Sequence, residues 1–481
     1  MNRISTDETQ IIKNHPCLIC VNLRLSVSLC VHLCPCVSKS KLVIPLDRAR
    51  AFCENTYMDI SEICKSLHTA QASLALHTAA QKNRALACVA DAISKNRSAI
   101  IAANKADLDA ARAKGMSEAL LERLMLDEKR IDGIVSSMGV VIAQSDPIGE
   151  VTGGWDTPAG LSIKQVRVPL GVVAIIYESR PNVTVDAFCL AYKSGNAILL
   201  RGSSSALNSN KTLVAAIQQG LEAAGKDGIA NALALCQPQA DHSDVDSILT
   251  ARGLIDCVLP RGGAKLIQNV VQNAKIPVIE TGAGVCHLFV DESADLEKAA
   301  AIAENAKIQR PGACNAIECI LLHKNIAGAF LPKLAARLAG RVELRCDKIS
   351  YDILTSAEID QKDRRFIPAE ESDFGFEFLD LVCAVKVVDG LEEAVSYINS
   401  HSTHHSESIC TNNRANARAF QAQIDSACVY VNASTRFTDG GEFGFGAELG
   451  ISTQKLHARG PMGIKALTTT KFLIDGDGQV R

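Results

Sequence analysis

The sequence lacks the short motifs that mark several large enzyme classes. It contains no Gly-x-Ser-x-Gly elbow, no phosphate loop ending in Gly-Lys-Ser or Gly-Lys-Thr, and no His-Glu-x-x-His pair. Each of those motifs supplies a specific nucleophile, phosphate cradle or zinc site. Their absence argues against several hydrolase and kinase functions.

Aromatic residues are also scarce, and the chain has no large excess of positive or negative charge. Aromatics make up 4% of the 481 residues, with one tryptophan, Trp155, and the formal net charge is −3. A chain without a basic excess has no general attraction for nucleic acid or for a membrane surface, and few aromatics leave little for base stacking. We therefore expect no nucleic-acid and no membrane partner. The length predicts more than one domain.

Cysteine is unevenly distributed along the chain. Six of the 18 cysteines fall within residues 1–57, namely Cys17, Cys20, Cys30, Cys34, Cys36 and Cys53. A metal knuckle on Cys17-x-x-Cys20 and an interrupted secretory signal are two interpretations of this segment, but the later spacing does not match a zinc pattern. We expect instead a disordered leader or a mis-assigned start, with the functional protein beginning near Met58. The other cysteines show no pairing pattern, which predicts a cytoplasmic location.

The periodicity of apolar residues predicts an α/β fold with parallel sheets. Helical spacing runs from Ile60 to Met138, and an alternating run at 161–168 predicts a two-faced strand. Beyond it, predicted strands alternate with predicted helices, which is typical of parallel sheets with right-handed crossovers. The predicted strands are 172–177, 197–200, 254–259, 277–280, 287–290, 316–323, 382–388, 408–411 and 428–431. The predicted helices are 183–193, 206–224, 263–273, 296–306, 326–338, 391–399 and 416–424.

Cys314 is the most informative single residue. It follows a Pro-Gly turn, Pro311-Gly312, and precedes the predicted strand at 316–323. A cysteine on such a turn can face a cleft and act as a nucleophile if its thiol pKa is lowered or a base is near. The alternative is a buried structural cysteine, since cysteine is among the most buried residue types.

Two strand ends carry glycines that suit a phosphate. Arg261-Gly262-Gly263 ends one predicted strand and opens a helix, whose free N–H groups and positive dipole end favour a pyrophosphate. Arg201-Gly202-Ser203 ends another, and a cation beside serines suits a nucleotide phosphate, including a 2′-phosphate. The alternatives are tight connections and a surface cation.

Charged residues near the other predicted strand ends suggest binding roles. Glu280 precedes a glycine-rich turn and could accept a proton, and Glu377 precedes a strand and could bind ribose hydroxyls. Arg180, Arg310 and Arg436 lie on predicted loops, and three such cations suit a multiply anionic small substrate. Each of these residues could also be an ordinary surface or structural charge.

Taken together, these segments resemble the aldehyde dehydrogenase superfamily, most closely its gamma-glutamyl phosphate reductase (glutamate-5-semialdehyde dehydrogenase) branch. The resemblance extends from residue 58 to residue 481. The segments that carry it are 168–172, 177–186, 199–202, 259–263, 280–287, 306–311, 314–315, 435–441 and 459–463.

The resemblance implies an activity and a chemical mechanism. The activity is NADPH-dependent reduction of L-glutamyl 5-phosphate to L-glutamate 5-semialdehyde and phosphate, the second step of proline biosynthesis from glutamate. Cys314 would form a thioester, and Glu280 matches the general base of hydrolytic relatives. Those relatives hold the oxyanion with an asparagine ahead of a proline. Here Ser179 falls at about that place and Asn182, a candidate catalytic residue, follows the proline, so the backbone N–H of Cys314 would carry more of the oxyanion load. NADP(H) is the implied cofactor, no metal is expected, and functional coupling to glutamate 5-kinase is a further expectation.

The resemblance also implies the domain organisation: two Rossmann-like parallel-sheet domains and a small β-arm. Residues 58–283 would form the NADP-binding domain, with 150–168 in an oligomerisation arm, and 284–450 the catalytic domain. Residues 451–481 would return to the cofactor domain, and their strand-like end, 466–474, could pair with 161–168. Strand exchange of this kind predicts a homo-oligomer, either a dimer or a tetramer.

Two alternative functions stay open at this point. A hydrolytic aldehyde dehydrogenase would turn over the semialdehyde without phosphate, whereas an acyl-phosphate reductase working in reverse would require phosphate. A non-catalytic scaffold that carries a thiol would keep its function after the substitution Cys314→Ser.

Overall fold

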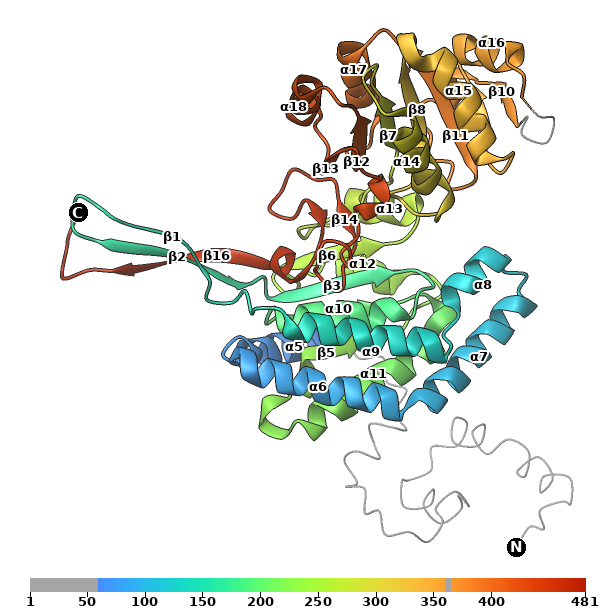
Figure 1. Cartoon of the computed structure of the whole chain (residues 1–481). Helices are drawn as coiled ribbons and strands as arrows, with labels where there is room; N and C mark the ends of the chain where they lie inside the picture. Colours follow the sequence, from blue (N-terminus) through green and yellow to red (C-terminus); the bar gives the residue numbers. More distant parts are fainter. Residues whose placement is uncertain (1–58, 360–364) are drawn as a thin grey trace, which may run out of the picture. The chain divides into compact units, whose positions relative to one another are not determined.

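The computed structural model describes residues 59–359 and 365–481. The part from Asp59 to Arg481 forms one unit by its internal contacts, and Figure 1 gives the labels of its elements. The interpretations of residues 1–57 lie outside the described residues. Among the described helices, none is both long enough and apolar enough to span a bilayer.

The described chain begins with a group of helices, as the periodicity predicted. These are α5 (Ile60–Leu74), α6 (Ala79–Lys95), α7 (Arg97–Ala113), α8 (Glu118–Leu124) and α9 (Glu128–Ala143). Local sequence fixes several of their starts. The Asp59 carboxylate accepts a hydrogen bond from the N–H of Ser61, and Thr78 and Gln81 form a reciprocal capping box at the start of α6. Such side chains satisfy backbone donors that a helix N-terminus leaves unpaired.

A four-stranded parallel sheet follows, in the order β5-β4-β3-β6. Its strands are β3 (Val172–Tyr177), β4 (Ala197–Arg201), β5 (Leu233–Leu235) and β6 (Cys257–Arg261). The connecting helices are α10 (Asn182–Lys193), α11 (Leu207–Ala223), α12 (Ser243–Leu249) and α13 (Ala264–Asn273). Every residue of β3 and β4 is buried, which explains their unbroken apolar runs, since a parallel sheet is covered on both faces.

A seven-stranded parallel sheet forms the next part, in the order β10-β9-β11-β8-β7-β12-β13. Its strands are β7 (Cys286–Val290), β8 (Ile317–His323), β9 (Glu343–Cys346), β10 (Phe366–Pro368), β11 (Val382–Val388), β12 (Ser406–Cys410) and β13 (Cys428–Val431). Its helices are α14 (Leu296–Ile308), α15 (Lys324–Leu338), α16 (Lys348–Ser356), α17 (Leu391–His401) and α18 (Arg414–Gln423). Leu288 and Val290 belong to one apolar cluster and Phe289 to another, so successive side chains enter cores on opposite faces.

The arm is an antiparallel sheet of β1 (Val151–Asp156), β2 (Ser162–Pro169) and β16 (Thr468–Asp475). The prediction that 466–474 pairs with 161–168 is confirmed, because β16 pairs with β2 from Thr468 to Asp475. Figure 1 shows these strands running side by side although they are far apart in sequence. Trp155 and Phe472 contact each other edge to face on this arm and are 51% and 53% exposed.

Several predicted boundaries are wrong. Residues 277–280 form no strand and make only an isolated bridge from Val278 to Val258 on the edge strand β6, because Pro277 has no N–H to donate to a ladder. The strand predicted at 254–259 begins only at Cys257, and the glycine-rich segment 149–160 contains the strand β1. The short elements β5, β9, β10, α12 and α16 were not predicted.

Short elements complete the fold. The small strands are β14 (Ile451–Ser452) and β15 (Gly460–Pro461), and the 3-10 turns are η1 (Ser204–Ala206), η2 (Gly225–Asp227), η3 (Ala230–Ala232), η5 (Glu371–Asp373), η6 (Thr435–Phe437) and η7 (Ile464–Leu467).

A buried ion pair fixes both ends of the segment that carries Cys314. Lys307, in the last turn of α14, and Glu318, in β8, lie 2.6 Å apart between Nζ and Oε2, and both side chains are 1% exposed. Glu318 Oε1 also accepts the backbone N–H of Leu379 at 3.3 Å. We call residues 309–316 the nucleophile loop. Because Lys307 and Glu318 flank it in sequence, their pairing holds the two ends of this loop together.

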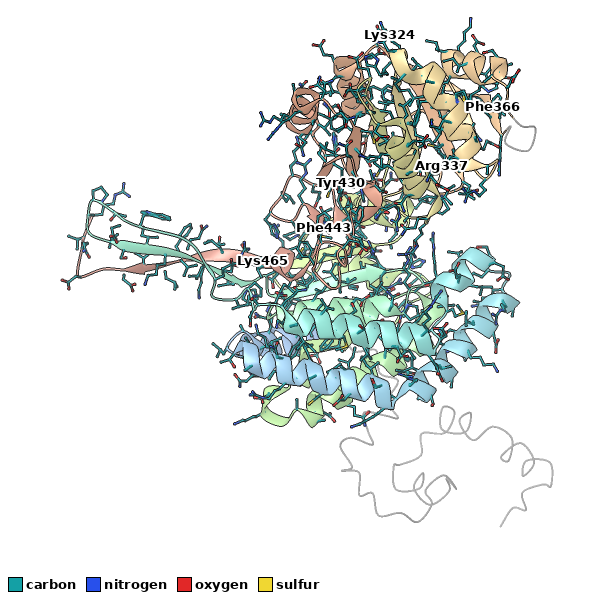
Figure 2. All side chains as sticks on the ribbon, in the orientation of Figure 1. Lys324, Arg337, Phe366, Tyr430, Phe443 and Lys465 are labelled. Carbon is teal, nitrogen blue, oxygen red and sulfur yellow. The ribbon has the colours of Figure 1, made fainter. Side chains whose placement is uncertain are left out.

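We expect Lys307→Met to lower the free energy of unfolding by about 3–5 kcal/mol, because it leaves the Glu318 carboxylate buried without its cation. Lys324→Met is the matched control: the Lys324 pair with Asp389 is 55% and 80% exposed, and Lys324 is labelled in Figure 2. Removal of an exposed pair costs about 0–1 kcal/mol. Urea denaturation of both variants measures the difference, and equal losses would contradict a structural role for the buried pair.

Candidate active site

The Cys314 thiol lies in the nucleophile loop, partly buried, against the turn that follows residue 280. Gly284 approaches so closely that a Cβ built on it would lie 1.5 Å from the carbonyl oxygen of Cys314. The Gly284 N–H donates to Glu377 Oε1 at 2.6 Å. Glycine is therefore required at position 284 by close packing, and Glu377 is brought near the thiol through that contact.

A second set of contacts ties the next residue, Asn315, to the segment around η6. Its Nδ2 donates to the backbone carbonyls of Thr438 at 2.8 Å and Arg436 at 3.4 Å. The Thr435 hydroxyl donates to the carbonyl of Asn315 at 2.6 Å. These three hydrogen bonds hold η6 beside the nucleophile, so residues 435–438 form one wall of the site.

The surroundings of the thiol pull its pKa in opposite directions. Burial raises the pKa of Cys314 to about 11, because an apolar environment disfavours the charged thiolate. The positive charges of Arg261 and Arg180 oppose this rise, whereas the negative charges of Glu448 and Glu377 add to it. At neutral pH the resting thiol is therefore mostly protonated.

Arginines are crowded around this thiol. Burial and the neighbouring cations Arg261, Arg123 and Arg310 lower the pKa of Arg180 to about 10. Burial and Arg310 also lower the pKa of Arg436, while the Cys314 thiolate would raise it. Cations that destabilise one another in this way form a site that favours an anionic ligand.

The structure thus brings together the three arginines predicted to bind the substrate, Arg180, Arg310 and Arg436, with Arg261 and Arg123. The Arg261 guanidinium lies 4.0 Å from the Glu448 carboxylate and lowers the pKa of the thiol, and its predicted role at a cofactor pyrophosphate stays a prediction. Arg123, at the end of α8, lies 3.9 Å from a Cβ built on Gly312.

Arg201 and Gly202 have structural partners. The Arg201 Nε donates to Asp244 Oδ2 at 2.6 Å in a buried ion pair. A Cβ on Gly202 would lie 2.2 Å from Asn210 Nδ2, so this glycine permits close packing beneath β4. Ser203 caps η1 through the N–H of Ser205. The binding roles of Arg201, Gly202 and Ser203 stay predictions.

The start of α13 has features that suit an anion, and its role in binding a cofactor pyrophosphate stays a prediction. Gly262 and Gly263 are exposed at the carboxyl end of β6, and no side chain caps this ten-residue helix. Gly262 also allows Glu178 to approach, since a Cβ there would lie 2.6 Å from the Glu178 carboxyl carbon. Uncapped N–H groups at a helix start are an anion site.

The remaining predicted residues have partners of their own. Asn182, the first residue of α10, donates from Nδ2 to Asp186 Oδ2 at 3.0 Å, and burial raises the pKa of Asp186 to about 6. Glu280 is partly buried, and its backbone N–H donates to the Gln454 side chain at 3.1 Å. The catalytic roles of Asn182 and Glu280, and the ribose-binding role of Glu377, stay predictions.

Sequence reasoning missed Glu448 as a site residue. Burial raises the pKa of Glu448, Arg261 opposes that rise, and Glu448 Oε2 accepts the N–H of Gly440 at 2.9 Å. Its position among the glycines of 440–450 is a weak signal for a loop that approaches a ligand. Arg123 has no local signal, because it reaches the site from a helix almost two hundred residues earlier in the chain.

We expect alkylation of Cys314 by iodoacetamide to accelerate roughly tenfold per pH unit from about pH 7 to about pH 10, since the thiolate is the nucleophile and its pKa is about 11. Glu448→Gln should speed the reaction and Arg261→Gln should slow it, each by about 3- to 10-fold. Peptide mass spectrometry measures each cysteine separately, with Cys88 as the internal control. Equal rates in the two variants would contradict the electrostatic model of the thiol.

Comparison with known proteins identifies the family of this chain. The model of the "Aldehyde dehydrogenase family" matches residues 48–348. A gamma-glutamyl phosphate reductase of Treponema pallidum (strain Nichols) is 51% identical over 430 residues, which cover 87% of this chain and 99% of that protein. One from Alkaliphilus oremlandii is 49% identical, covering 87% and 98%.

A solved structure of similar sequence shows the same fold. The crystal structure of gamma-glutamyl phosphate reductase from Thermotoga maritima has 46% identity and a TM-score of 0.83, covering 88% of this chain and 100% of that one. The prediction of an aldehyde dehydrogenase-like α/β fold is confirmed. The chain therefore belongs to the aldehyde dehydrogenase family, which implies a nicotinamide cofactor, and within that family to the gamma-glutamyl phosphate reductases.

Proposed function

We propose that this chain reduces L-glutamyl 5-phosphate to L-glutamate 5-semialdehyde and phosphate, with NADPH as the reductant and Cys314 as the covalent nucleophile. This is the second step of proline biosynthesis from glutamate. The observation that carries the proposal is a partly buried thiol surrounded by arginines on a loop fixed at both ends. The names of the most similar relatives support it.

The reaction proceeds in two halves. The Cys314 thiolate attacks the acyl carbon, and the carbon–oxygen bond to phosphate breaks, which leaves a thioester on Sγ. A reduced nicotinamide supplies the hydride that the second half requires. The thiohemiacetal oxyanion that results on Cys314 then collapses: the carbon–oxygen double bond re-forms, the carbon–sulfur bond breaks, and the aldehyde leaves with the thiolate restored.

The chain's own residues assist both halves. The backbone N–H of Cys314 and the amide of Asn182 stabilise the negative oxygen that develops on the acyl group. Arg180 and Arg261 lower the pKa of the thiol and attract the phosphate. Glu448, whose own pKa burial raises, opposes this effect, because its negative charge raises the pKa of the thiol. Glu280, which matches the general base of hydrolytic relatives, is less needed here, since phosphate is a good leaving group.

The glycines at the start of α13 would hold the cofactor pyrophosphate, and Glu377 would bind ribose hydroxyls. The preference for NADPH over NADH rests on Arg201 and the serines that follow it. Functional coupling to glutamate 5-kinase is consistent with an acyl phosphate as the substrate. Every cysteine in the described ranges carries a free thiol, which suits a cytoplasmic location.

The purified protein should reduce NADP⁺ when it is given L-glutamate 5-semialdehyde, and only when phosphate is present. Spectrophotometry at 0 and saturating phosphate measures this dependence, with NAD⁺ as the comparison cofactor. Cys314→Ser should lower turnover by about 10³-fold or more, because the thioester can no longer form. The variant Cys88→Ser is the matched control and should retain activity.

Two results would reject the proposal. Equal turnover without phosphate would assign a hydrolytic aldehyde dehydrogenase, because water would then resolve the thioester. Full turnover of Cys314→Ser would remove the covalent mechanism.

The arm supports a homo-oligomer as part of the proposal. Apolar side chains on it, including Trp155, Phe472 and Ile474, are 51%, 53% and 57% exposed, and exposed apolar groups on a strand edge favour pairing with another chain. Phe472→Asp should therefore lower the mass measured by light scattering. Leu76→Asp, at a residue that is 84% exposed outside the arm, should leave the mass unchanged. An unaltered oligomer in Phe472→Asp would assign the interface elsewhere.

A further inference from the structure

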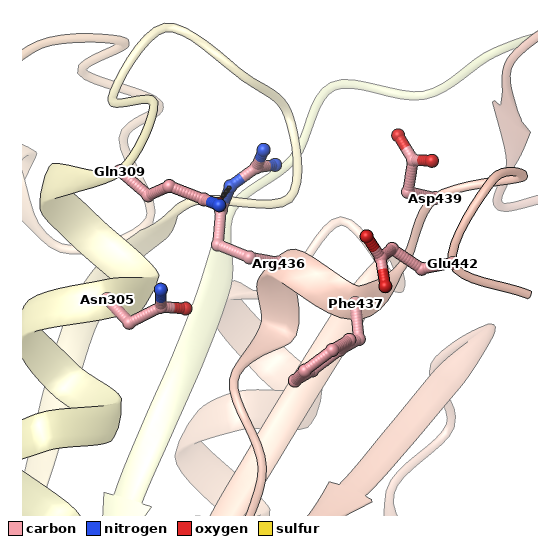
Figure 3. A pocket seen from close by; sticks show the side chains of 6 residues that line it. All are labelled: Asn305, Gln309, Arg436, Phe437, Asp439 and Glu442. Atoms are coloured by element: carbon pink, nitrogen blue, oxygen red, sulfur yellow. Dashed lines mark hydrogen bonds between the residues drawn. The ribbon is translucent and has the colours of Figure 1, made fainter.

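A small polar cavity adjoins the wall formed by η6. Its volume is about 180 Å³, and its lining consists of Asn305, Gln309, Arg436, Phe437, Asp439 and Glu442. Pockets for drug-sized ligands measure about 300–1,000 Å³, so this cavity suits a small polar group and is too small for a dinucleotide. Figure 3 shows these side chains around one opening, with Gln309 and Asn305 on one side and Asp439 and Glu442 on the other.

The cavity combines one cation with two carboxylates. Gln309 Oε1 accepts from Arg436 Nε at 2.9 Å, which holds the guanidinium and leaves its terminal nitrogens for another partner. Asp439 Oδ1 accepts the N–H of Gly441 at 2.8 Å. In Figure 3 the guanidinium lies beside Gln309, and the Asp439 and Glu442 carboxylates lie across from it. A ligand that satisfies both kinds of charge must carry a negative and a positive group close together.

The position of the cavity relative to Cys314 is set by hydrogen bonds. Asn315, the residue after the nucleophile, donates to the carbonyls of Arg436 and Thr438, and Thr435 donates back to Asn315. Gln309 opens the nucleophile loop itself. A short chain with one end in the cavity can thus place its other end at the thiol.

The two carboxylates also indicate which part of the substrate does not bind here. The negative charges of Asp439 and Glu442 would repel a phosphate. A phosphate could bind in the cavity only if both carboxylates were neutralised. At the thiol, Arg261 and Arg180 are opposed by Glu448 and Glu377, and Arg123 and Arg310 add further positive charge around Arg180. The phosphate therefore belongs on that side, and the opposite end of the substrate belongs in the cavity.

We infer that the cavity binds the α-amino-acid end of the substrate: Arg436 binds the α-carboxylate, and Asp439, with Glu442 beside it, binds the α-ammonium group. This inference rests on the proposed function. It makes Asp439 and Glu442 specificity-determining residues that distinguish an α-amino acid from a plain dicarboxylic semialdehyde. A charge-assisted hydrogen bond of this kind changes affinity by about 10- to 100-fold.

The test crosses three variants with three substrates in the phosphate-dependent oxidation. The substrates are L-glutamate 5-semialdehyde, glutarate semialdehyde, which lacks the amino group, and 4-aminobutanal, which lacks the carboxylate; concentrations are corrected for cyclic forms. Asp439→Asn should lower kcat/KM for L-glutamate 5-semialdehyde by about 10- to 100-fold and change that for glutarate semialdehyde less than about threefold. Arg436→Gln should show its loss with both carboxylate substrates and not with 4-aminobutanal.

Glu442→Gln is the third variant. Because the Glu442 side chain is exposed, this substitution should not disturb folding, so the test stays decisive even if Asp439→Asn fails to fold. It should lower kcat/KM for L-glutamate 5-semialdehyde more than that for glutarate semialdehyde. Asp352→Asn removes an exposed carboxylate from α16 and should change none of the values.

The outcomes separate this inference from the proposed function. The inference would be overturned if Asp439→Asn and Glu442→Gln each lowered kcat/KM equally for L-glutamate 5-semialdehyde and for glutarate semialdehyde. In that case, phosphate-dependent turnover by the unaltered protein would still uphold the proposed function. Absence of phosphate-dependent turnover in the unaltered protein would overturn both.

Discussion

The arrangement of the site depends on the buried pair of Lys307 and Glu318. Two charges that are 1% exposed carry a large desolvation cost, and their 2.6 Å contact offsets it only while both are in place. Because the nucleophile loop connects α14 and β8, the geometry of Cys314 follows from that contact.

Two further constraints act on the same loop from outside. Gly284 packs against the Cys314 carbonyl, and Asn315 hydrogen-bonds to the wall at residues 435–438. The loop is thus held at its two ends and also near its nucleophile. In the proposed mechanism the thiol approaches an acyl carbon and a nicotinamide, and rigidity serves that mechanism because small displacements of reacting atoms reduce rates strongly.

In the proposed arrangement, arginines surround the thiol, where the phosphate of the substrate would lie, and two carboxylates line the cavity, where its α-ammonium group would lie. The cations near the thiol come from separate elements: Arg180 follows β3, Arg261 ends β6, Arg123 ends α8, Arg310 belongs to the nucleophile loop, and Arg436 belongs to η6. The carboxylates Asp439 and Glu442 are confined to the cavity beside η6. The resting thiol stays protonated because burial outweighs the nearby arginines.

The sequence by itself determined the α/β class, most of the long elements and the pairing of the arm. Buried parallel strands such as Val172–Tyr177 are unbroken apolar runs, and helices carry caps, so local patterns suffice for them. It also marked Cys314, through its turn and the family resemblance. Only the tertiary structure decided that Arg261 acts on the thiol, that Arg201 is paired with Asp244, and that Glu448 and Arg123 belong to the site. The reason is physical: a charge acts through space, and its neighbours here lie on elements that folding, not sequence adjacency, brings together.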